Sequence, residues 1–252
     1  MFIFKFILRF VLTPFVLIKN IFLYAYGYIF KSNNDCINSL RKNGFYFFDK
    51  TISADDLNQF FEEFNRLLEL HKISSSGQDN GRIVFGSTEN AVVKNFIDFA
   101  QKKACEYFNT SFIEPDLLYF QTSKPEDIND NVPGGAYHMD DNKKNLKFFI
   151  YMNDVYEENG PFIYAPNTHG FFSINKLYRW FLWELTLKRS ALYQKPSHTF
   201  KHSVDIVGAK GSIFCADTTG YHKAKSVKAG QRSVFVVSFA ETRFDPYRLA
   251  NI

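Results

Sequence analysis

The alternation of apolar and polar residues predicts two amphipathic helices in the first half of the chain. Ser53 stands three residues before Asp56, the spacing of a capping box, and opens the first helix. Apolar residues then recur every three or four positions, at Leu57, Phe60, Phe61, Phe64, Leu67 and Leu68. A second helix is expected over residues 90–108. Its apolar face would carry Val93, Phe96, Ile97 and Ala100. The polar segment 31–43 is interpreted as a linker to a short strand at 44–48.

From residue 113 onward the pattern changes from a helical to a strand-like period. Short runs rich in β-branched and aromatic residues are separated by Gly, Pro, Asn and Asp. These runs are residues 117–121, 146–152, 162–164, 204–207, 212–215 and 233–239. Many short strands without regularly alternating helices indicate a barrel or jelly roll rather than a parallel sheet. We therefore expect a mainly β domain with flanking helices (α+β) and a cupin-like jelly roll as its core.

An insertion at about residues 170–200 interrupts the strand pattern between its third and fourth runs. A helix is expected there from Ser173 to about Arg189. Its bulky apolar residues are Leu177, Tyr178, Trp180, Phe181 and Trp183. We expect this insertion to form a lid or part of a substrate-binding wall.

Residues 1–30 are apolar at nearly every position, with Lys5, Arg9, Lys19 and Asn20 as the main interruptions. At about 100° per residue, these four fall within roughly a third of a helical turn. The predicted helix therefore has a wide apolar face and a narrow basic stripe. Such a helix can lie in the headgroup layer of a membrane, with its aromatic side chains in lipid.

Other interpretations of this helix remain open. It is long enough to span a bilayer, since about 20 apolar residues suffice, but Lys19 and Asn20 near its centre would cost on the order of a few kcal/mol. A cleaved signal peptide fits less well, because residues 25–28 are bulky where cleavage needs small side chains. The helix could also pack against its own domain or a partner. We divide the chain into a membrane-associated N-terminal helix, 1–31, and a single domain, 32–252.

Composition excludes some function classes. The chain has 252 residues, which suits one well-filled domain. Its net charge of +4 is small and the basic residues are scattered among acids, so we expect no nucleic-acid partner. Cys36, Cys105 and Cys215 are an odd number without C-x-x-C spacing, which argues against a disulfide framework or a zinc site. Free thiols in a reducing compartment are expected.

Three residues carry the strongest chemical signal in the chain. His138 and Asp140 are two residues apart after Gly134-Gly135, so both side chains project the same way if this segment is extended. His222 follows a turn and precedes the last strand hairpin, where a jelly roll would return it to the first pair. Two His and one carboxylate on one face of a metal leave open positions on the other, as iron(II) needs to activate O2.

Arg232 opens the last strand and could bind the far carboxylate of a 2-oxo acid bidentately. In the preceding central strand, Lys147, Phe149 and Tyr151 share the face that we expect to line the cavity, and Gln121 is a further candidate from the strand 117–121. Taken by itself, a triplet such as His138-Met139-Asp140 is more often a surface histidine beside an acidic residue. Arg232 taken by itself is most simply interpreted as a solvated residue at a strand end. The order of the His-x-Asp triplet, the distant His222 and Arg232 along the chain favours the interpretation that they form one metal and 2-oxo acid site.

Four ordered motifs carry a resemblance to a known family. They are Asn43-Gly44-Phe45, Ala136-Tyr137-His138-Met139-Asp140, residues 146–155 continuing into 159–169, and residues 211–222 with Arg232. Across about residues 40–242 the chain resembles the phytanoyl-CoA dioxygenase family of iron(II)- and 2-oxoglutarate-dependent oxygenases.

The resemblance implies a double-stranded β-helix in which His138, Asp140 and His222 hold iron (Fe2+) and Arg232 anchors the cosubstrate 2-oxoglutarate. Phe149 stands where family members often have Trp beside the cosubstrate. Thr168-His169 matches a position that stabilises a turn. Because a halide can bind only where the carboxylate is missing, Asp140 indicates a hydroxylase rather than a halogenase. The implied reaction decarboxylates 2-oxoglutarate to succinate and hydroxylates a small-molecule substrate.

Three hypotheses of function follow. The first is a membrane-associated 2-oxoglutarate-dependent dioxygenase that hydroxylates an apolar or lipid-linked substrate, with its catalytic domain in the cytoplasm. The second is a non-catalytic, membrane-associated binding module on the same fold. The third is a cupin-like metal enzyme that needs no 2-oxo acid, which Arg232 speaks against.

Overall fold

The computed structural model describes residues 15, 18, 22, 32–71, 82–125, 135–140, 144–169, 178 and 200–240. Most of the predicted N-terminal helix and of the helical insertion therefore lies outside the described residues. Phe15, Ile18, Phe22 and Tyr178 are helical and exposed. Among the described residues, no helix has the length and hydropathy that crossing a membrane requires.

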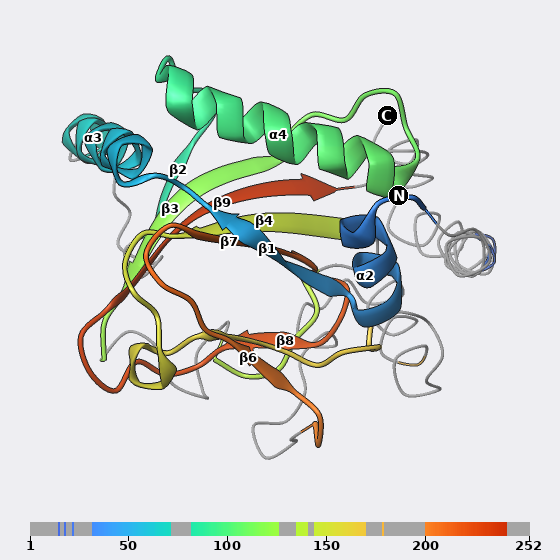
Figure 1. Cartoon of the computed structure of the whole chain (residues 1–252). Coiled ribbons are helices and arrows are strands. Elements are labelled where there is room, and N and C mark those ends of the chain that lie inside the picture. The colour runs from blue at the N-terminus through green and yellow to red at the C-terminus, as the bar shows by residue number, and fades with distance from the viewer. Residues whose placement is uncertain are drawn as a thin grey trace, which may run out of the picture.

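Two antiparallel sheets form the core of the structure (Figure 1). The larger sheet has the order β1-β7-β4-β9-β3-β2, and the smaller sheet has the order β6-β5-β8. In chain order the larger sheet contains β1 (Phe45–Thr51), β2 (Arg82–Phe85), β3 (Leu117–Ser123), β4 (Asn145–Tyr151), β7 (Ser212–Asp217) and β9 (Arg232–Ala240). The smaller sheet contains β5 (Phe162–Tyr164), β6 (Val204–Ile206) and β8 (His222–Ala224). The predicted fold, mainly β with a jelly-roll core and flanking helices, is confirmed.

Three helices lie on the same side of the larger sheet, away from the smaller one (Figure 1). The two predicted amphipathic helices are confirmed as α3 (Ala54–His71) and α4 (Ala91–Phe108). Asn90 caps α4, since its side chain accepts hydrogen bonds from the amides of Val92 and Val93.

The interpretation of residues 31–43 as a linker is wrong, because residues 35–43 form helix α2 (Asp35–Asn43). The side chain of Asn34 caps its first turn by accepting a hydrogen bond from the amide of Cys36. Gly44 ends the helix in the left-handed conformation. Ile37 and Leu40 are buried, so one short apolar face is enough to dock this mostly polar segment. A short 3-10 helix, η1 (Glu157–Asn159), precedes β5.

The two faces of the larger sheet bury different sets of side chains. The face toward the helices carries Phe148, Ile150 and Phe235 in one apolar cluster. The opposite face, called the inner face below, carries Phe149 and Tyr151, which pack in a second cluster between the two sheets. This two-residue alternation is the one that the sequence predicted for the central strand. The thiols are free, and the buried Cys36 and Cys215 have their Sγ atoms 3.8 Å apart.

Gly44 joins helix α2 to both sheets at a point of close approach. Its backbone has φ +86°, and its carbonyl oxygen accepts a hydrogen bond of 2.7 Å from the amide of Asp217. A Cβ atom at this position would overlap the Tyr164 hydroxyl and the His169 ring. Only glycine fits both the backbone conformation and the available space.

We expect Gly44→Ala to lower the free energy of unfolding by about 1–3 kcal/mol, because it adds left-handed strain to a steric overlap. Urea denaturation measures the change. Gly86→Ala is the matched control, since a Cβ there has no atom within 4 Å. Equal stabilities of the two variants would contradict this account of Gly44.

Candidate metal centre

The side chains of His138, Asp140 and His222 converge on one another. One potential ligand atom from each residue lies within 4.8 Å of the others. Asp140 Oδ1 is 3.5 Å from His138 Nε2, and Asp140 Oδ2 is 3.6 Å from His222 Nε2. The structure thus brings together the three candidate ligands that the sequence pattern singled out.

Backbone pairing places the two histidines opposite each other. His138 and His222 form an isolated antiparallel bridge in which each amide donates to the other's carbonyl at 3.0 Å. Their ring centroids are 4.4 Å apart. Tyr137 and Tyr221, each directly before a histidine, both pack against Phe200, Tyr137 edge-on and Tyr221 stacked.

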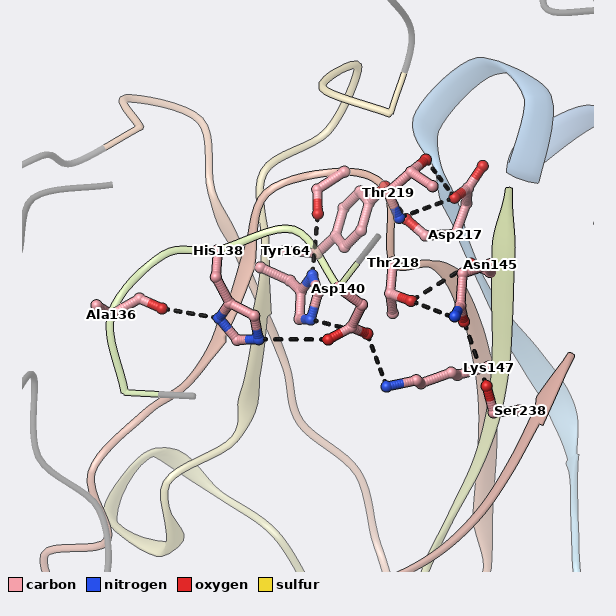
Figure 2. A network of polar contacts seen from close by, with 12 residues as sticks. Ala136, His138, Asp140, Asn145, Lys147, Tyr164, Asp217, Thr218, Thr219 and Ser238 are labelled. Carbon is pink, nitrogen blue, oxygen red and sulfur yellow. Dashed lines mark hydrogen bonds and ion pairs between the residues drawn. The ribbon is translucent and has the colours of Figure 1, made fainter. Parts of the chain in front are cut away.

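Local hydrogen bonds orient both imidazole rings. Nδ1 of His138 lies 2.9 Å from the Ala136 carbonyl oxygen, and Nδ1 of His222 lies 2.9 Å from that of Gly220 (Figure 2). A carbonyl oxygen only accepts, so each Nδ1 donates to it and each Nε2 is turned toward Asp140. Metal-binding histidines are commonly oriented in this way. Both Nε2 atoms lie close to Asp140.

Lys147 pairs with the carboxylate at the centre of this cluster. Its Nζ atom lies 2.6 Å from Asp140 Oδ2 (Figure 2). Burial alone would raise the pKa of Asp140, but Lys147 and both histidines hold the pKa well below its usual range. Burial alone would lower the pKa of Lys147, but Asp140 raises it above the ordinary value. The two groups therefore stay charged.

His222 stays neutral near pH 7. Burial, together with the neighbouring His138, lowers the pKa of His222 below its ordinary value, although Asp140 acts in the opposite direction. A neutral imidazole with a free Nε2 is the form that binds a metal.

A network around Asp217 holds the turn that leads into His222. The Asp217 carboxylate accepts hydrogen bonds from the Tyr107 hydroxyl at 2.6 Å, and from the amide and hydroxyl of Thr219 at 3.0 and 2.6 Å. Its backbone carbonyl accepts a hydrogen bond of 2.7 Å from the Tyr164 hydroxyl. Sequence reasoning missed Asp217, because an Asp in a turn sequence is common and its helix partner lies 110 residues away.

The same turn depends on two residues beyond β5. The Thr168 hydroxyl accepts from the amide of Tyr221 at 2.8 Å and donates to the carbonyl of Ala165 at 2.6 Å. His169 is buried, and its Nε2 lies 2.9 Å from the carbonyl oxygen of Arg41. Neither residue belongs to the cluster of potential metal ligands. Thr168 bonds the turn directly, and the backbone carbonyl of His169 accepts a hydrogen bond of 3.4 Å from the Thr219 hydroxyl, so both residues contact the turn, as the family resemblance implied.

Arg232 is buried, so the interpretation as a solvated strand end does not hold. Its guanidinium donates to the Gly160 carbonyl and, at 3.3 Å, to the Ser123 hydroxyl. Burial lowers the pKa of Arg232, but an arginine stays charged near pH 7. Among the described residues, no carboxylate lies within ion-pair distance of this guanidinium.

The other predicted pocket residues lie on the inner face as well. Phe149 stacks on Phe214, with ring centroids 4.5 Å apart and planes 4° apart. The Tyr151 hydroxyl donates to the Ile206 carbonyl at 2.5 Å and accepts from the Phe162 amide at 3.3 Å, and burial raises its pKa. Tyr151 therefore ties the two sheets together.

Gln121 contacts a residue that sequence reasoning missed. Its side-chain oxygen accepts a hydrogen bond of 3.4 Å from Arg82 on β2. The signal for β2 was the apolar run Ile83-Val84-Phe85, which is only three residues long.

Comparison with known proteins identifies the fold. No protein-family model matches the chain, and no curated protein sequence matches it. SnoK, a non-heme alpha-ketoglutarate-dependent carbocyclase from nogalamycin biosynthesis, is similar in structure, with a TM-score of 0.62 and 12% identity over 88% of this chain and 92% of SnoK. HygX from Streptomyces hygroscopicus, with nickel and 2-oxoglutarate bound, gives a TM-score of 0.57 and 12% identity over 86% and 90% of the two chains.

AviO1 from Streptomyces viridochromogenes Tue57 gives a TM-score of 0.56 and 13% identity, covering 86% of this chain and 99% of AviO1. At such low identity these likenesses show a shared fold. The class that the structure defines is therefore a jelly-roll protein of this fold with a His-Asp-His cluster.

We expect Lys147→Met to destabilise the metal-free protein at pH 7, because it leaves the Asp140 carboxylate without its partner. The side chains of Lys147 and Asp140 are 15% and 13% exposed. We therefore expect a loss of about 1–3 kcal/mol, less than for a fully buried pair. The loss should narrow as pH falls toward the ordinary pKa of Asp, since an unpaired Asp140 then takes up a proton. Urea denaturation with a chelator present measures both effects.

The double variant Asp140→Asn/Lys147→Met removes both charges and should regain most of the stability. Lys102→Met, on the exposed side of α4, is the control and should change stability by less than about 0.5 kcal/mol. If the double variant is no more stable than Lys147→Met, the loss of stability comes from the packing of the lysine stem and not from the ion pair.

Proposed function

We propose that this protein is an iron(II)- and 2-oxoglutarate-dependent dioxygenase, related to the phytanoyl-CoA dioxygenase family, that hydroxylates an apolar or lipid-linked small molecule. One observation carries the proposal. The chain has a His138-Asp140-His222 cluster and also, on the inner face, a buried Arg232 that has no carboxylate partner among the described residues. A metal site alone does not need that arginine, whereas a dicarboxylate cosubstrate does.

The residues present fit iron(II). Two imidazole Nε2 atoms and one carboxylate are the donor set of non-haem iron sites, and a three-residue set leaves coordination positions for other ligands. When bound, iron(II) and 2-oxoglutarate would supply the oxidising chemistry that couples decarboxylation to succinate with transfer of oxygen from O2 to the substrate. The chain itself supplies the orientation of ligands and substrate.

Arg232 would anchor the far carboxylate of 2-oxoglutarate. Ser123 and the Gly160 carbonyl fix the plane of its guanidinium, which suits bidentate binding. Phe149 and Phe214 form a stacked aromatic wall on the inner face, which would help to exclude water from a bound cosubstrate. Tyr151 and Gln121 would complete the wall, and Lys147 would hold Asp140 in place by contacting its Oδ2 atom.

Two kinds of likeness support the assignment. HygX has the same fold and was solved with 2-oxoglutarate bound, and SnoK is named as alpha-ketoglutarate-dependent. The family motifs in the sequence lie at the cluster and at the turn that precedes His222. A binding module without turnover is the alternative on the same fold. A metal enzyme that needs no 2-oxo acid is disfavoured by the burial of Arg232.

We expect the anaerobic protein to bind one iron(II) and then 2-oxoglutarate, with a charge-transfer absorption band. His222→Ala should lose stoichiometric iron, because it removes one of three ligands. Arg232→Met should keep iron but weaken 2-oxoglutarate binding by about tenfold or more, the effect of losing a charged hydrogen-bond partner. Iron content and titration of the absorption band measure these effects.

Exposed residues provide the matched controls, His202→Ala for the metal and Lys228→Met for the cosubstrate, and both should behave as wild type. Wild type should also convert 2-oxoglutarate slowly to succinate in air, and Asp140→Ala should not. If wild type retains iron but wild type and Asp140→Ala produce equal amounts of succinate, the non-catalytic binding module is the better description. A wild type that binds no iron would refute the site altogether.

We also propose that the N-terminal helix holds the protein at a membrane surface, with the catalytic domain in the reducing cytoplasm. Phe15, Ile18 and Phe22 support this, since their helical spacing places them on one face and they are 66%, 51% and 69% exposed. Free thiols throughout the chain fit a reducing compartment.

We expect the full chain to sediment with phospholipid vesicles and a version that begins at Lys31 to remain in the supernatant. High salt should release little of the full chain, because the aromatic face binds through burial in lipid rather than through charge. Equal sedimentation of the two versions would contradict the membrane role of the helix.

A further inference from the structure

A buried polar cluster joins three strands of the larger sheet beside the candidate ligands. Asn145 opens β4, Thr218 directly follows β7, Ser238 lies on β9, and all three are buried. The side-chain oxygen of Asn145 accepts hydrogen bonds from the hydroxyls of Thr218 at 3.1 Å and Ser238 at 3.3 Å (Figure 2). The backbone carbonyl of Asn145 also accepts from the Thr218 amide at 2.7 Å. A buried polar network with its hydrogen bonds made fixes one arrangement of the chain.

The turn after β7 carries this arrangement to two of the three candidate ligands. The carbonyl oxygen of Thr218 accepts a hydrogen bond of 3.0 Å from the Asp140 amide. Two residues further on, the carbonyl oxygen of Gly220 lies 2.9 Å from Nδ1 of His222. The turn therefore presents one backbone acceptor to each of these ligands. A shift of the turn relative to β4 would displace the Asp140 carboxylate and rotate the His222 ring.

Strand β4 contacts Asp140 both directly and through the turn. Lys147 lies 2.6 Å from the Asp140 carboxylate, and Asn145 acts on the Asp140 backbone through Thr218. Residues two apart on a strand share a face, so both side chains lie on the inner face of β4. Ser238, which pairs with Lys147 in the β4–β9 register, completes the contacts of Asn145. The backbone and the side chain of Asp140 are thus both referred to the same strand.

We infer that Asn145 and Thr218 are positioning residues of the metal centre, which set Asp140 and His222 relative to each other before a metal binds. The inference rests on the proposed function. Neither residue belongs to the cluster of potential ligands, so both act through the turn. Removing a hydrogen-bond partner of a metal ligand typically weakens metal binding by about 10–100-fold. A purely structural role in joining the three strands would instead lower stability and leave metal binding unchanged.

Thr218→Val tests the inference in the full chain, because valine keeps the branched shape of threonine and loses the hydroxyl. Cobalt(II) is the probe, since its visible absorption bands depend on the geometry of its ligands. We expect Thr218→Val to bind cobalt(II) at least about tenfold more weakly than wild type and to show a changed absorption spectrum. Thr218→Ser restores the hydroxyl and should recover both the affinity and the spectrum.

Thr122→Val is the matched control. The hydroxyls of Thr122 and Ser233 are 3.0 Å apart between β3 and β9, so this variant loses a hydrogen bond of the same kind away from the cluster of potential ligands. It should become less stable in urea and bind cobalt(II) as wild type does, with the same spectrum.

Unchanged cobalt(II) affinity and spectrum in Thr218→Val would show that the polar cluster serves folding alone, and would overturn the inference. If Thr218→Val does not fold, Asn145→Ala removes the acceptor and keeps the backbone contact, and an unchanged affinity and spectrum in that variant overturn the inference. A wild type that binds neither cobalt(II) nor iron(II) would refute the proposed metal centre itself, and the inference with it.

Discussion

The buried carboxylate of Asp217 is the interaction on which the site depends most. A carboxyl group in the interior is unfavourable by about 1–3 kcal/mol or more unless hydrogen bonds replace its lost water. Three donors do so here, one from α4 and two from Thr219. The backbone of the same residue bonds Gly44 through its amide and Tyr164 through its carbonyl. One residue therefore connects a helix, the start of β1, the smaller sheet and the turn before His222.

The two faces of the larger sheet differ in the kind of side chain that they bury. The helix-facing side is filled with phenylalanine and aliphatic side chains, and its packing provides most of the apolar burial. The inner face also carries charged side chains at two levels. Lys147 pairs with Asp140 at 2.6 Å at the level of Ser238, and Arg232, at the start of β9, donates to Ser123 at 3.3 Å. Buried charges add little net stability, so their presence here is better explained by binding than by folding. The aromatic wall of Phe149 and Phe214 lowers the local polarity and strengthens each of these contacts.

The sequence predicted those parts of the molecule that follow a simple period. The apolar spacing of α3 and α4 and the alternation in β4 are local signals, and the structure confirms both. The spacing of His138 and Asp140 was equally readable, because residues two apart on an extended segment share a face. The helix α2 was missed because its signal lies in the capping residues Asn34 and Gly44 rather than in a long apolar stripe. Arg82 and Asp217 were missed because their significance arises from pairing with distant segments, which a single sequence does not display.

The antiparallel pairing of His138 with His222 has a consequence for the shape of the coordination sphere. Directly opposed residues of an antiparallel pair are related by a local two-fold axis, so each neighbour on one segment has a counterpart on the other. The counterpart of Asp140, two residues after the first histidine, is Ala224, two residues after the second. A carboxylate thus stands on one side of the axis and a methyl group on the other. The His-Asp-His cluster is asymmetric because these two side chains differ.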